Sequence, residues 1–165
     1  MSRFEPIFAA LDDAGARYVL VGGLAVVLHG YARLTADVDL AVDLSPGQAI
    51  KPIAALSRIG LIPRAPVEAR DFADPEKRRE WIEEKGMRVF SMHDPRRPLV
   101  EVDLFVEPPL PFDELLARAE WVTVGARRVP VASIPDLIAM KRIAARPKDE
   151  QDIAALEAIA RRRTT

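Results

Sequence analysis

The feature that most constrains this chain is the stretch of residues 21–40, with the sequence VGGLAVVLHGYARLTADVDL. Its glycine pair, Gly22 and Gly23, predicts a turn between the end of a buried strand and the start of a short helix. After a loop, a second strand begins with Asp37 and Asp39. Side chains alternate between the two faces of a strand, so both aspartates should point to one face and their apolar neighbours into a core.

Two carboxylates side by side at a strand end repel each other unless a cation lies between them. Carboxylate oxygens are hard ligands of the kind that Mg²⁺ prefers. Upstream, glycine lets the backbone approach a ligand closely, and free N–H groups at a helix start attract phosphate. Together these features predict chemistry on a nucleoside triphosphate. Taken separately, each has an ordinary alternative, namely a solvent-facing strand with alternating acids and a tight turn.

A third carboxylate, Asp103, lies between Val102 and Leu104 in the strand-like sequence EVDLF. Burying a charge without a partner is costly, so an acid in this position should be either paired or functional. If its strand lies beside the one that carries Asp37 and Asp39, the three carboxylates converge. Such a set could hold two Mg²⁺ ions roughly 4 Å apart, and Asp103 could accept the proton of an attacking hydroxyl.

The rest of the chain predicts one mixed α/β domain over residues 1–165, with a helical C-terminal segment at 134–162. Apolar residues at helical spacing alternate with short strand-like runs, and a turn is expected at residues 93–98. Ser45 and the proline after it predict the start of a helix that runs to about residue 59. Asp149 is expected to cap the final helix.

Composition narrows the functional classes. Apolar residues make up 49% and charged residues 30% of the 165 residues, which is typical of a soluble globular chain. There is no cysteine, so disulfides and cysteine-ligated zinc are excluded. No apolar run is long enough for a membrane span, the N-terminus lacks a signal-peptide core, and we expect a cytoplasmic protein. The net charge of −1 provides no general attraction to nucleic acid.

Two glycines, thirteen residues, then Asp-x-Asp and a later isolated acidic strand residue resemble the polymerase-β-type nucleotidyltransferase superfamily. The strings GGLAVVLHGYARLTADVDL and DLIAMKRIAARPKDEQDI are most similar to AbiEii-type and related minimal nucleotidyltransferases. The resemblance covers roughly residues 18–160. It implies a small, mixed, twisted β-sheet flanked by helices.

The resemblance also implies an activity: Mg²⁺-dependent transfer of a nucleoside monophosphate from an NTP to an acceptor hydroxyl. The acceptor could be RNA such as tRNA, a protein or a small molecule. The chain could be the toxin of a toxin–antitoxin pair, with a cognate antitoxin as its partner. A non-catalytic nucleotide- or protein-binding module on the same fold is the alternative, although the three intact aspartates argue against it.

Carried over to this sequence, the resemblance implies that Gly22 and Gly23 hold the β- and γ-phosphates. Asp37 and Asp39 would bind both metal ions, with Asp103 as the third ligand and the base. Many family members have serine at the second glycine, so here only backbone N–H groups can serve.

The resemblance further implies that Arg33 reaches the triphosphate and that Lys141 and Lys148 lie near the nucleotide or support its site. Each has an alternative: an ordinary loop arginine, a lysine whose stem packs on apolar neighbours, and an exposed lysine before a helix cap.

Overall fold

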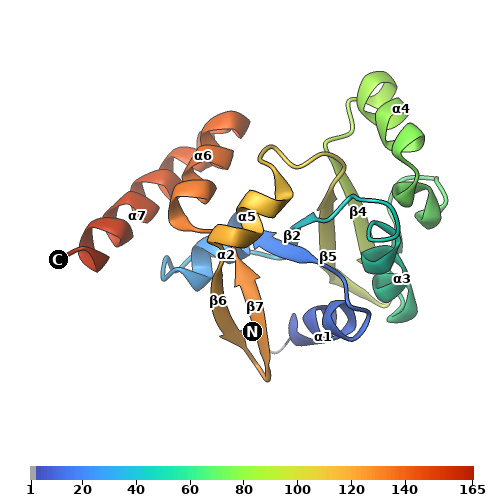
Figure 1. The fold of residues 1–165 in the computed structure, drawn as a ribbon. Coiled ribbons are helices and arrows are strands. Elements are labelled where there is room, and N and C mark those ends of the chain that lie inside the picture. Colours follow the sequence, from blue (N-terminus) through green and yellow to red (C-terminus); the bar gives the residue numbers. More distant parts are fainter. Residues whose placement is uncertain (1–2) are drawn as a thin grey trace.

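A computed structural model describes residues 3–165, and its centre is one seven-stranded sheet with the strand order β3-β4-β5-β2-β1-β7-β6 (Figure 1). The strands are β1 (Tyr18–Val21), β2 (Asp37–Val42), β3 (Ile62–Pro63), β4 (Val89–Asp94), β5 (Arg97–Phe105), β6 (Glu120–Val124) and β7 (Arg127–Val131). The helices are α1 (Glu5–Asp13), α2 (Gly22–Leu28), α3 (Ile50–Arg58), the 3₁₀ helix η1 (Ala69–Ala73), α4 (Pro75–Lys85), α5 (Phe112–Arg118), α6 (Ile134–Ala144) and α7 (Pro147–Arg163).

The sheet is mixed, as the sequence led us to expect. β1 pairs with β2 in antiparallel and with β7 in parallel orientation, while β2 pairs with β5 in parallel orientation. All four residues of β1 are buried because the strand is flanked on both edges and covered on both faces. The predicted α/β fold, a mixed sheet with helices around it, is confirmed.

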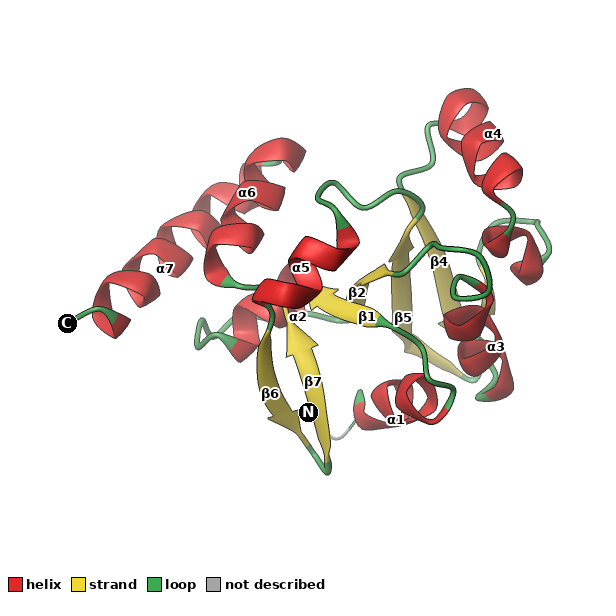
Figure 2. Ribbon diagram, in the orientation of Figure 1, coloured by secondary structure: helices red, strands yellow, loops and turns green. Residues whose placement is uncertain are grey.

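Two pairs of helices lie at opposite ends of the sheet, and α1, α2 and α5 lie near its middle strands (Figure 2). α6 and α7 pack against each other near the β6-β7 end, whereas α3 and α4 lie at the β4 end. Within residues 3–165, no helix is both long enough and apolar enough to cross a membrane.

Three local predictions were wrong. The helix expected from residue 46 begins at Ile50, because Gly47 has a left-handed φ of +78° and the chain turns there. Asp149 does not stand at the cap of α7 but in its first turn, where its side chain accepts a hydrogen bond from the Arg146 N–H at 3.1 Å. The hairpin turn is shorter than expected, since β4 extends to Asp94 and β5 begins at Arg97.

Candidate active site

The three predicted carboxylates lie on two adjacent strands. Asp39 on β2 is the direct register partner of Asp103 on β5, and Asp37 is the partner of Glu101. Because residues in register share a face, Asp37, Asp39 and Asp103 all point to the same side of the sheet. The apolar residues between them are fully buried on the other side. The structure thus brings together the set that the sequence predicts.

These carboxylates repel each other when all are charged. Burial and, after it, the charges of Asp103 and Asp37 raise the pKa of Asp39 to about 6, although a hydrogen bond from the Gly23 N–H opposes the rise. Burial also raises the pKa of Asp103. The Ser91 hydroxyl opposes this rise by donating a hydrogen bond of 2.5 Å to Asp103 Oδ1. A cation bound among these carboxylates would relieve this repulsion.

The glycine turn lies directly against the carboxylates. Gly22 has a left-handed φ of +67°, and a Cβ atom on it would overlap the Asp39 side chain. A Cβ on Gly23 would lie 3.0 Å from Thr35 Oγ1 and 3.4 Å from Arg33 Nη2. Glycine is therefore required at Gly22 by both conformation and space, while at Gly23 it leaves room beneath the Arg33 guanidinium.

A cavity of about 870 Å³ opens beside these groups, within the range of small-molecule sites. All the residues predicted from the sequence contribute to its wall: Gly22, Gly23, Arg33, Asp37, Asp39, Asp103, Lys141 and Lys148. Residues from both ends of the chain therefore meet around one space.

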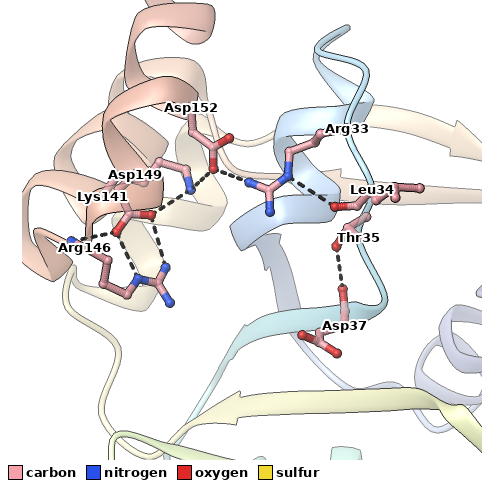
Figure 3. A network of polar contacts seen from close by, with 8 residues as sticks. All are labelled: Arg33, Leu34, Thr35, Asp37, Lys141, Arg146, Asp149 and Asp152. Atoms are coloured by element: carbon pink, nitrogen blue, oxygen red, sulfur yellow. Dashed lines mark hydrogen bonds and ion pairs between the residues drawn. The ribbon is translucent and has the colours of Figure 1, made fainter.

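The basic wall of this cavity comes from α6, α7 and the loop before β2 (Figure 3). Lys141 is buried, and its Nζ lies 2.7 Å from Asp152 Oδ2 and 3.3 Å from Asp149 Oδ1. The Arg33 guanidinium also pairs with Asp152. Lys148, by contrast, is exposed at the margin of the cavity.

Asp152, Arg146 and Ser91 belong to this site but were not predicted. Asp149 and Asp152 stand three residues apart on α7 and so share one helix face, which is a signal the sequence does contain. Ser91 faces Asp103 only because of the register between β4 and β5, which the sequence does not specify.

The donor chemistry fits a hard cation, because the carboxylates of Asp37, Asp39 and Asp103 face one space and the pKa values of Asp39 and Asp103 are raised. As the side chains stand, however, no three His, Asp or Glu residues of the described chain are grouped closely enough to hold a metal ion.

The sequence matches the family described as nucleotidyl transferase AbiEii toxin, of type IV toxin–antitoxin systems, over residues 7–160. The chain belongs to the AbiEii nucleotidyltransferase family. It is therefore a nucleotidyltransferase, an enzyme that uses an NTP as substrate, and the predicted family and enzyme class are confirmed. No match was found among curated protein sequences.

Solved nucleotidyltransferase structures share this fold. The lincosamide antibiotic adenylyltransferase LnuA, solved with lincomycin bound, is 18% identical with a TM-score of 0.64, over 96% of this chain and 97% of that one. The antibiotic-resistance factor ANT(2'')-Ia is 14% identical with a TM-score of 0.59, over 94% of this chain and 80% of that one. A nucleotidyltransferase-like antigenic protein from Paracoccidioides brasiliensis is 17% identical with a TM-score of 0.58, over 93% of this chain and 74% of that one.

Proposed function

We propose that Asp37, Asp39 and Asp103 bind Mg²⁺ and that the enzyme transfers a nucleoside monophosphate from an NTP to an acceptor hydroxyl. The observation that supports this most strongly is the register of β2 and β5, which pairs Asp39 with Asp103 beside the Gly22 turn. When bound there, Mg²⁺ would neutralise the triphosphate and lower the pKa of the attacking hydroxyl.

In this proposal the chain positions both reactants. The turn at Gly22 and Gly23 receives the β- and γ-phosphates, and Arg33 and Lys148 on the basic wall balance their charge. Asp103 takes the proton from the acceptor hydroxyl. The hydroxyl oxygen bonds to the α-phosphorus, the bond from that phosphorus to the bridging oxygen breaks, and pyrophosphate leaves.

We propose RNA such as tRNA, a protein or a small molecule as the acceptor, and a toxin role opposed by a cognate antitoxin. The toxin role is supported by the family description, which names the toxin of type IV toxin–antitoxin systems. We place the reaction in the cytoplasm, where NTPs are supplied.

Incubation of the protein with labelled NTPs, Mg²⁺ and cell extract tests this function. Wild type should transfer label to a discrete species, and Asp37→Ala should transfer none. Glu83→Gln, on the exposed surface of α4, is the matched control and should behave like wild type. Equal labelling by wild type and Asp37→Ala would contradict the proposal. Tight binding of ATP with no pyrophosphate release would instead support a non-catalytic binding module.

A further inference from the structure

We propose that Asp152 and Lys141 are positioning residues that hold the Arg33 guanidinium over the glycine turn, so that its Nη2 faces the bound triphosphate. This inference rests on the proposed function, because it assigns the means by which the same site orients its phosphate-binding arginine. It also gives Lys141 an indirect role in place of direct contact with the nucleotide.

Arg33 reaches the turn from the loop between α2 and β2. A Cβ atom on Gly23 would lie 3.4 Å from its Nη2, so the guanidinium covers the turn itself. Its Nη1 is taken by Asp152, and its Nε makes a long contact of 3.4 Å with the Leu34 carbonyl. In the described part of the chain Nη2 donates no hydrogen bond, which leaves this N–H group for a phosphate oxygen.

Asp152 pairs with the Arg33 guanidinium through a buried carboxylate. Its side chain is only 3% exposed, while that of Arg33 is 26% exposed. The same oxygen, Oδ2, accepts hydrogen bonds from both Arg33 Nη1 and Lys141 Nζ, the latter at 2.7 Å. Charge-assisted bonds away from water are strong, so this shared oxygen fixes the arginine in one orientation.

Lys141 forms ion pairs within the protein. Its side chain is 6% exposed and its Nζ lies between Asp152 and Asp149. Asp149 in turn accepts hydrogen bonds from the Arg146 N–H at 3.1 Å and from Arg146 Nε at 2.9 Å. The network therefore connects the loop of Arg33 to α6 and to the first turn of α7, as Figure 3 shows.

The charge of this network suits an anion. Three cations, Arg33, Lys141 and Arg146, share two carboxylates, so the cluster retains one net positive charge. Of its members, Arg33 is the one that lies over the glycine turn. A purely structural clamp between α6 and α7 would not require an arginine from the distant loop.

A double-mutant cycle tests the proposal, with calorimetric binding of inorganic tripolyphosphate in the presence of MgCl₂ as the readout. Arg33→Gln should weaken binding about tenfold or more, and Asp152→Asn about tenfold, because each removes one charge-assisted contact or its support. The double variant should bind like Arg33→Gln alone, since Asp152 acts through Arg33. Arg142→Gln, which removes an exposed ion pair between α6 and α7, should bind like wild type.

The proposal would be overturned if the affinity losses of the two single variants multiplied in the double variant, or if Asp152→Asn bound like wild type. Failure of the wild type to bind tripolyphosphate would also overturn it. If Asp152→Asn does not fold, Asp152→Glu, which keeps the charge but displaces the carboxylate, takes its place in the cycle. Binding requires no turnover. An intact cycle in a protein that transfers no label would therefore support this inference while refuting the proposed function.

Discussion

The acidic and basic walls of the cavity are built in different ways. The acidic wall stands on β2 and β5, where backbone pairing sets the positions of Asp39 and Asp103. The basic wall depends on side chains that reach across from separate segments, such as Arg33 to Asp152, which are 119 residues apart. The acidic wall holds like charges together, whereas in the basic wall opposite charges hold the segments together. We therefore expect changes in the acidic wall to abolish activity and changes in the basic wall to weaken the fold.

The largest effect is expected in the acidic wall. Asp39→Asn should reduce nucleotidyl transfer on the order of 10³-fold or more, because a bound metal contributes several kcal/mol to transition-state stabilisation. Its thermal midpoint should equal or exceed that of wild type, because the change removes a charge that burial and two neighbouring carboxylates disfavour. Rates with labelled NTP and a thermal melt measure the two quantities. A variant that transfers normally would remove Asp39 from the site.

The contrasting change in the basic wall is Lys141→Met. It leaves Asp149 and Asp152 with one buried cation fewer, and should lower the free energy of unfolding by about 3 kcal/mol. Lys148→Met is the matched control: this side chain is exposed, and its loss should change stability by less than about 0.5 kcal/mol. Urea unfolding compares the two. Equal stability of both variants would show that the network does not support the fold.

At the glycine turn beside the acidic wall, the steric cost of a glycine substitution can be separated from its cost in backbone strain. Gly22→Ala adds a methyl group against Asp39 at a left-handed φ of +67°, while Gly15→Ala adds one at φ +63° with open space around it. The second should cost about 1 kcal/mol of strain and leave transfer unchanged. The first should cost more in urea unfolding and also stop transfer. Equal costs would mean that the turn and Asp39 are not in close contact.

How far the sequence predicts the site differs between the two walls. The alternation in DVDLAV and EVDLF correctly predicted which residues point away from the core, because strand geometry is local. That β2 and β5 are neighbours was only a condition in the prediction, since strand order depends on crossovers rather than on local pattern. The link from Arg33 to Asp152 was missed, because nothing local to either segment specifies it.

The smallest expected effect is a difference in response to acid. The folded-state pKa of Asp39 is raised, so its charged form costs stability at neutral pH, and this cost disappears as the pH falls through about 6 towards the unfolded value. The pKa of Asp149 is lowered by its contacts with Arg146, despite its burial, so its contribution is present at neutral pH and is lost at acidic pH.

Urea unfolding of wild type, Asp39→Asn and Asp149→Asn with a chelator, at about pH 4 and about pH 7, measures these opposite signs. At neutral pH the Asp39 variant should be at least as stable as wild type and the Asp149 variant less stable. At about pH 4 the difference for the Asp39 variant should shrink, whereas the difference for the Asp149 variant should largely remain, because the pKa of Asp149 is lowered below its usual value. Differences of the same sign at neutral pH would contradict the contrast between the two walls.

The most direct test of the central proposal is a titration of Mn²⁺, as a paramagnetic substitute for Mg²⁺, into the protein with a non-hydrolysable NTP analogue. Electron paramagnetic resonance then counts the bound ions. We predict that wild type binds the ion and that Asp103→Asn loses this binding, since its carboxylate completes the set on β2 and β5. Undiminished ion binding by Asp103→Asn would contradict the proposal that these two strands form the metal site.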